Sequence, residues 1–184
     1  MNLYLKHSKT KIRKGLWETN SSSVHSLVIK KESPKNLPKE VFFGLGEYGW
    51  EEGWYNGIEE KCRYLNTALY CRYVCYYDDK SEYKKYQQKI SEILKTNGIN
   101  ATWFDISKID EDDMYNYHID HADELEDFIS YVIDIDPNLL IQWLFNEDSV
   151  LVTDNDNNDM EITEKAREKY ENNHDDYIFY TKGN

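Results

Sequence analysis

The chain is organised around Trp17-Glu18-Thr19-Asn20-Ser21-Ser22-Ser23-Val24-His25-Ser26, a polar stretch that runs directly into the apolar residues Leu27-Val28-Ile29. It places a carboxylate, an amide, several hydroxyls and an imidazole next to a predicted buried strand. Such a density of donors and acceptors suits a site whose groups must be held still. The alternative is a simple turn, because Asn and Ser side chains hydrogen-bond to nearby backbone and favour turns and caps.

Two features of the sequence favour a functional site over a turn. Glu18 and His25 are residue types that serve as general base and acid near neutral pH. The segment before them is strongly basic, and basic side chains bind a nucleic-acid backbone. We therefore predict catalytic roles for Glu18 and His25 and a phosphate- or RNA-binding role for a second set of residues. These are Lys9, Lys11, Arg13, Lys14, Asn20, Ser22 and Ser23.

A second cluster with chemical potential is His118-Ile119-Asp120-His121. Two imidazoles around a carboxylate can bind a divalent metal or supply an acid and a base. In an extended segment His118 and Asp120 would share a face, whereas at a helix start His118 and His121 would. The alternative is that Asp120 caps the following helix and both histidines are only partly buried.

The motif from Lys14 to Ser26 resembles the opening of a family of small phage and mobile-element proteins of Firmicutes that carry a Glu-Thr-Asn-Ser-Ser-Ser-x-His-Ser signature. Some of these proteins resemble type II-A anti-CRISPR inhibitors of Cas9, including one implicated in damage to the guide RNA. The resemblance implies a counter-defence protein whose partners are RNA and Cas9, or another host defence effector. Matching pieces elsewhere are Phe43-Gly44, Tyr48-Gly49-Trp50, Glu60-Lys61, Tyr64-Leu65, Thr67-Ala68-Leu69, His118-Ile119-Asp120-His121, Leu144-Phe145-Asn146 and Asp154-Asn155-Asp156-Asn157.

The charge of the chain is unevenly distributed. Of its 184 residues, 1–39 contain nine Lys or Arg and two acids, whereas 40–184 contain thirteen and thirty-three, giving net charges of +7 and −20. We predict one domain, 1–184, with a basic N-terminal segment (1–39) and an acidic body (40–184) that repels nucleic acid or meets a basic protein. No apolar run reaches the ~18 residues of a membrane span, and no signal peptide is evident. The expected location is the cytoplasm of the bacterial host cell, away from membranes.

Strand and helix patterns are mixed without regular alternation. This favours an α+β fold, a single domain with a largely antiparallel sheet and several packed helices. Gly44–Gly57, rich in glycine and aromatics, is predicted to be a mobile loop. Ser81 is expected to cap a helix that Gly98 ends. Strands are expected at 26–29, 40–43, 101–106, 149–153 and 177–181, and helices at 58–76, 81–98, 125–133, 139–144 and 161–172.

The run Asp154–Asp159 resembles a calcium loop only in part. Its sixth position is Asp159 where an EF-hand needs glycine, and its twelfth is Lys165 where a glutamate is needed. We predict a tight polar turn instead, which the family resemblance places beside the site. The three cysteines, Cys62, Cys71 and Cys75, are expected to be reduced and mostly buried, because they lack the spacing of a zinc site.

Three hypotheses follow for function. The first is a ribonuclease that cleaves the guide RNA of Cas9, with His25 as general acid or base, His118 or His121 as its complement, and Glu18 orienting an imidazole or binding metal. The second is a non-enzymatic inhibitor whose acidic body mimics nucleic acid. The third is a metal-dependent phosphoester hydrolase unrelated to CRISPR. Mutation of His25 separates the first from the second, and sensitivity to a chelator tests the third.

Overall fold

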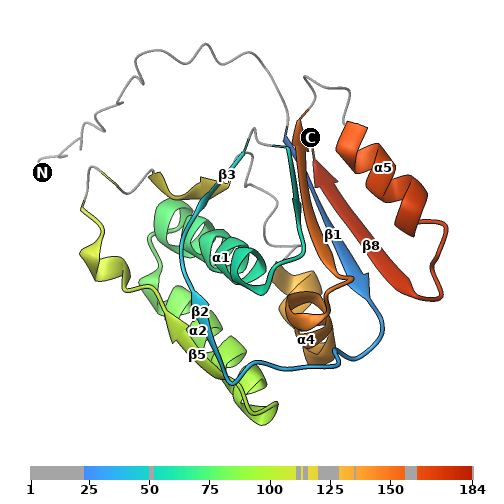
Figure 1. Cartoon of the computed structure of the whole chain (residues 1–184). Coiled ribbons are helices and arrows are strands. Elements are labelled where there is room, and N and C mark those ends of the chain that lie inside the picture. The colour runs from blue at the N-terminus through green and yellow to red at the C-terminus, as the bar shows by residue number, and fades with distance from the viewer. Residues whose placement is uncertain are drawn as a thin grey trace, which may run out of the picture.

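The computed structural model describes residues 23–49, 52–110, 113, 116–119, 129–134, 136–155 and 161–183. It confirms the predicted α+β class. A four-stranded sheet has helices on both of its faces, with α1 (Ile58–Leu69) and α4 (Pro137–Phe145) on one side and α5 (Glu161–Tyr170) on the other (Figure 1).

The sheet joins strands from the two ends of the chain. Its order is β4 (Gly53–Tyr55), β7 (Val150–Asn155), β1 (Ser23–Lys30) and β8 (Tyr177–Gly183), and every neighbouring pair is antiparallel. The motif that dominates the sequence therefore leads into a central strand, which is buried along nearly its whole length.

Alternation along β1 divides the core into two clusters. Leu27 and Ile29 face the larger cluster with α1 and α4, whereas Val28 faces a smaller cluster that includes Ala166 and Tyr170 of α5. Side chains of a strand point alternately to the two faces of a sheet, so His25 and Ser23 lie on the same face as Leu27.

The helices follow the predicted periodicity. Cys62, Leu65 and Leu69 form a buried stripe on α1, which continues as a π-helix from Tyr70 to Tyr76. The next helix, α2 (Lys80–Thr96), ends before Gly98 at φ +76° as expected, but Asp79 rather than Ser81 caps its start. A carboxylate one residue outside the helix reaches the N–H groups of both Ser81 and Glu82, so it displaces the serine from the capping role.

Two small parallel pairs flank the main sheet. Strand β2 (Glu40–Phe43) pairs with β5 (Asn100–Trp103), and β3 (Glu47–Tyr48) pairs with β6 (His118–Ile119). The prediction of a loop over Gly44–Gly57 is therefore wrong in part, because that stretch contains β3 and β4. Both are only two or three residues long and exist through pairing with distant segments, which local sequence does not reveal.

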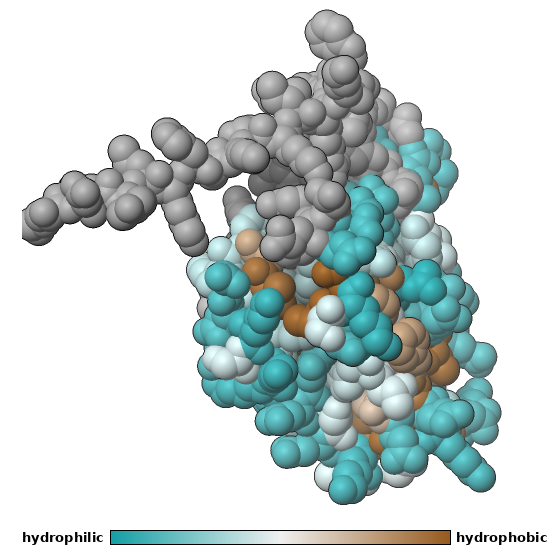
Figure 2. All heavy atoms as spheres, turned by 90° about the vertical axis from the view of Figure 1, so that its left-hand side faces the viewer, coloured by the Kyte–Doolittle hydropathy of each residue, from teal (hydrophilic) through white to brown (hydrophobic). Residues whose placement is uncertain are grey.

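Short helical turns and free thiols complete the described structure. A 3₁₀-helix spans Ile106–Lys108 and a π-helix spans Ser130–Asp134. The three cysteines are free, two of them buried. The surface shown in Figure 2 is mainly hydrophilic, with small hydrophobic patches between the polar side chains. Among the described helices, none is long and apolar enough to cross a membrane.

Candidate functional site

His25 is held by a tyrosine on the helix that covers its face of the sheet. The imidazole is 8% exposed, and its Nδ1 lies 2.6 Å from Oη of Tyr64, with the ring centroids 5.6 Å apart. Burial raises the pKa of Tyr64 well above its usual value. The phenol therefore stays protonated at neutral pH and fixes the orientation of the histidine ring.

The strand register gathers further polar side chains around His25. His25 lies opposite Thr153 of β7, and Ser23 lies opposite Asn155. All four are buried, at the end of a face that continues with the apolar residues Leu27 and Leu151. We call Ser23, His25, Thr153 and Asn155 the polar end of the sheet.

The pattern of backbone hydrogen bonds along β1 determines how closely these cross-strand pairs approach. Lys31 N donates to Asp176 O, so the backbone groups of the odd-numbered residues of β1 point toward β8. On the β7 side His25 and Thr153 are then a non-hydrogen-bonded pair, in which opposite side chains approach most closely. The site thus brings an imidazole, hydroxyls and an amide together in a buried setting.

Three tyrosines enclose the polar end. The ring of Tyr48 meets that of Tyr64 edge-on at 4.9 Å between centroids and that of Tyr55 at 6.1 Å. Gly53 lies opposite Thr153, and a Cβ at Gly53 would lie only 2.1 Å from the Tyr55 ring. The glycine therefore lets the Tyr55 ring cover the sheet at this point.

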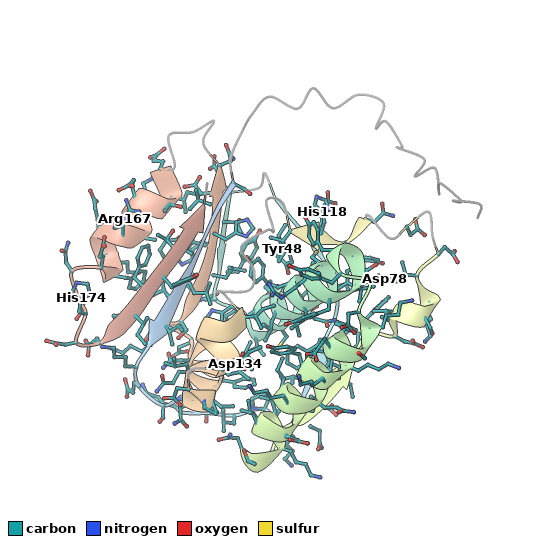
Figure 3. All side chains as sticks on the ribbon, turned by 180° about the vertical axis from the view of Figure 1, so that it is seen from behind. Tyr48, Asp78, His118, Asp134, Arg167 and His174 are labelled. Carbon is teal, nitrogen blue, oxygen red and sulfur yellow. The ribbon has the colours of Figure 1, made fainter. Side chains whose placement is uncertain are left out.

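His118 lies on β6, next to this tyrosine group. It pairs with Glu47 in register, and its Nε2 is 3.8 Å from a Glu47 carboxylate oxygen. The next residue of β3 is Tyr48, and Figure 3 shows Tyr48 and His118 beside each other. His118 is 27% exposed, and its buried Nδ1 has no hydrogen-bond partner within the described structure. His118 itself is extended, but Asp120 and His121, on which the two predicted geometries depend, lie outside the described residues.

The structure brings together only some of the predicted site residues. Ser23 and His25 lie in the polar end. His118 faces Glu47 on the β3–β6 pair, whereas Tyr48, whose ring meets Tyr64, points to the other face with Ile119. The remaining predicted residues lie outside the described ranges: Lys9, Lys11, Arg13, Lys14, Glu18, Asn20, Ser22, Asp120 and His121.

Sequence reasoning missed three members of the site. Tyr64 is not among the predicted site residues, and Thr153 is predicted only as the last residue of the strand at 149–153. Asn155 is the second residue of the predicted turn Asp154–Asp159. That prediction is wrong for Asp154 and Asn155, because pairing with β1 extends β7 through both of them. Polar residues at alternate positions of two otherwise apolar strands are the signal that could have identified Thr153 and Asn155.

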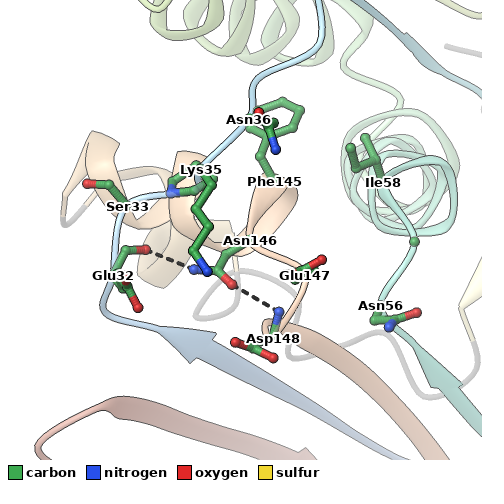
Figure 4. Close-up of a pocket in the computed structure, with 12 residues that line it drawn as sticks. Glu32, Ser33, Lys35, Asn36, Asn56, Ile58, Phe145, Asn146, Glu147 and Asp148 are labelled. Carbon is green, nitrogen blue, oxygen red and sulfur yellow. Dashed lines mark hydrogen bonds between the residues drawn. The ribbon is translucent and has the colours of Figure 1, made fainter.

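The pocket in Figure 4 lies elsewhere on the molecule. It has a volume of about 310 Å³ and is lined mainly by the segments 32–36, 56–58 and 145–148. No predicted site residue lines it, and its central amide, Asn146, is already bonded to Glu32 O and Asp148 N. In the described part of the chain, no three His, Cys, Asp or Glu side chains are grouped to hold a metal ion.

Comparison with known proteins adds no relative: no protein-family profile, curated protein or solved structure matches the chain. The polar end and the tyrosines around it are therefore interpreted from their own geometry.

Proposed function

We propose that this protein is a phage or mobile-element counter-defence protein that cleaves RNA at a site centred on His25, with the guide RNA of Cas9 as its substrate. The observation that supports this proposal best is the polar end of the sheet. Burying four adjacent polar positions costs free energy unless each is hydrogen-bonded, and apolar residues would fill the same space more simply. Such a cluster around a fixed histidine is typical of a catalytic site.

The proposed chemistry assigns a role to each described residue. His25 exchanges a proton with a ribose hydroxyl or with the leaving oxygen, as general base or acid. Tyr64 is a positioning residue, because its protonated hydroxyl holds the imidazole at Nδ1. Ser23, together with the basic segment that precedes it in sequence, binds the phosphate. His118, on the strand that pairs with β3, is the proposed complementary acid or base.

The low exposure of His25 constrains the proposal. Because only 8% of the residue is accessible, an RNA strand reaches the ring only when the site opens. We therefore expect cleavage of RNA bound to its effector protein rather than of free RNA, since binding energy from the effector can drive the opening.

The test is the integrity of guide RNA on a denaturing gel after incubation with RNA-loaded Cas9 or with RNA alone. Wild type is compared with His25→Ala and with His174→Ala, which removes an exposed histidine on the far side of the sheet (Figure 3). Discrete shortened RNA with wild type and His174→Ala, but not with His25→Ala, is the expected result.

Other outcomes of this experiment have distinct meanings. Intact RNA with blocked DNA cleavage would reject catalysis and favour the acidic mimic, which His25→Ala should leave active. Chelator-sensitive hydrolysis of small phosphoester substrates, with the guide RNA left intact, would favour the metal-dependent phosphoester hydrolase. Intact RNA with unblocked DNA cleavage would reject both counter-defence readings.

A further inference from the structure

The outer edge of β8 offers unpaired backbone groups in a defined pattern. Lys31 N donates to Asp176 O, so in the β1–β8 register Ile178 and Tyr180 bond inward to β1. Tyr177, Phe179 and Thr181 then direct their N–H and C=O groups outward. Two contacts agree with this hydrogen-bonding pattern. Tyr177 N donates to Asn173 O in the preceding turn instead of to β1. The hydroxyls of Ser26 and Thr181 meet at 2.7 Å, as expected for a pair that exchanges no backbone hydrogen bonds.

The first five residues of this edge lack the features that usually prevent strand pairing. Proteins shield edge strands by making them short, by placing Pro, Lys or inward charges on them, or by covering them. Strand β8 is seven residues long, and its first residues, Tyr177-Ile178-Phe179-Tyr180, are aromatic or branched and half-buried. The opposite edge, β4, spans only three residues. Among the described residues, nothing pairs with the outer side of β8.

We propose that β8 pairs antiparallel with β8 of a second copy of this chain, so that the two sheets join into one across a two-fold axis at Phe179. In this arrangement the N–H of each Phe179 donates to the C=O of the other Phe179. The N–H of each Thr181 donates to the C=O of Tyr177 in the second copy. The N–H of Tyr177 stays in its own turn, so both outward groups of Phe179 and the N–H of Thr181 gain a partner, whereas the C=O of Thr181 does not.

Side chains and charge favour a second copy over an unrelated extended peptide. On the α5 face of the joined sheet, the two Phe179 residues stand directly opposite each other, and aromatic cross-strand pairs stabilise antiparallel sheets. In sequence, β8 follows Asp175 and Asp176 and includes Lys182. The two-fold register sets position 176, an aspartate that lies 3.4 Å from Lys30 Nζ of its own copy, opposite position 182, which is a lysine in the sequence.

The first test uses the wild-type chain. We measure mass by light scattering or sedimentation between about 1 µM and about 200 µM, because a short interface gives weak association. The mass should rise from 22.0 kDa toward twice that value. Over the same range, hydrogen exchange at the amides of Phe179 and Thr181 should slow several-fold, while the amides of Ile178 and Tyr180 stay protected throughout. A monomer at every concentration, or no change at Phe179 and Thr181, would overturn the proposal.

The second test uses the symmetry of position 179. Phe179→Lys alone and Phe179→Glu alone each place like charges opposite themselves, so each variant should remain monomeric. An equimolar mixture of the two should recover the dimer. Phe179→Thr is the control for loss of the ring, because it keeps a strand-forming residue without charge; it should dimerise more strongly than either charged variant. Failure of the mixture to associate, with both variants folded by circular dichroism, would contradict the two-fold register.

Discussion

The hydroxyl of Tyr64 and the Nδ1 of His25 lie 2.6 Å apart, although the two residues are thirty-nine positions apart in sequence. The contact joins the central strand of the sheet to the helix that covers it. It gives the histidine one fixed neighbour whose proton does not leave near neutral pH, because burial raises the pKa of Tyr64. The orientation of the ring is therefore set by the core, whatever the surface residues around it do.

Removing this hydroxyl should separate activity from stability. Tyr64→Phe keeps the ring in the core but leaves His25 without its fixed neighbour, so we expect unfolding to become about 1–2 kcal/mol easier and RNA cleavage to fall about tenfold or more. Tyr83→Phe is the matched control, because the buried Tyr83 hydroxyl donates to Asn66 Oδ1 at 2.9 Å in a different part of the core. Its stability should drop similarly, in urea unfolding, while cleavage stays unchanged. Equal activity in the two variants would remove Tyr64 from the site.

The histidines should differ in their reactivity toward diethylpyrocarbonate. His174 is exposed, His118 is 27% exposed and His25 is 8% exposed, so carbethoxylation followed by peptide mass spectrometry should proceed in that order. Addition of RNA-loaded effector should accelerate the reaction at His25 if the site opens on binding. A His25 rate that stays slow under conditions of active cleavage would show that the ring is not the acid or base.

A buried aspartate should matter more for stability than an exposed one with a similar role. Asp154 is fully buried, and its carboxylate accepts from Asn155 N at 2.9 Å and from Thr163 N in the first turn of α5 at 2.7 Å. Asp154→Ala leaves both N–H groups without this acceptor, so we expect a loss of about 2–3 kcal/mol in the free energy of unfolding. Asp79→Ala, at the exposed cap of α2, should cost clearly less, because water can solvate the N–H groups that the carboxylate leaves. Denaturant unfolding of both variants checks the difference, and similar losses would contradict it.

Lys61 should make stability depend on pH in the alkaline range. Its ammonium is fully buried and donates to the carbonyls of Asn146 and Ser149, at 3.1 and 3.0 Å, near the end of α4. Burial lowers its pKa to about 8 from 10.5. Between these values the unfolded chain binds more protons than the folded one, so the contribution of Lys61 to stability rises with pH.

The contribution of Lys61 can be measured by comparing the unfolding free energies of wild type and a Lys61 variant at two pH values. Between pH 7 and pH 9 the contribution of Lys61 should improve by about 1 kcal/mol, because one pKa unit corresponds to about 1.4 kcal/mol. The difference in unfolding free energy between wild type and Lys61→Met should therefore shift by that amount in favour of wild type. Lys95→Met, at an exposed position, should show no such shift. A pH-independent difference for Lys61→Met would mean that the lysine stays charged throughout.

Local sequence signals predicted most of the regular elements and none of the long-range pairings. The apolar period of Cys62, Leu65 and Leu69 located α1, and Gly98 located the end of α2, since both signals act within a turn or two of helix. The strands β3 and β4 escaped prediction because their pairing partners are β6 and β7, far along the chain. Propensity has little influence on so short a strand.

The candidate site was predictable to the same limited extent. His25 stood out because its chemistry is visible in the residue itself. The contact from Tyr64 depends on which face of α1 packs against β1. The positions of Thr153 and Asn155 depend on the β1–β7 register, and a shift of that register by one residue would turn both side chains away from His25. The roles of Glu18 and of the basic residues before it remain predictions, because they lie outside the described ranges.

The central position of β1 also determines when the surroundings of His25 can form during synthesis. Both neighbours of β1 in the sheet, β7 and β8, are translated long after it, and the ribosome adds only about 5–20 residues per second. A nascent chain thus carries the histidine for several seconds before Thr153 and Asn155 exist to complete its surroundings. Assembly of the polar end depends on these late strands, so a prematurely terminated product would carry the motif without Thr153 and Asn155 beside His25.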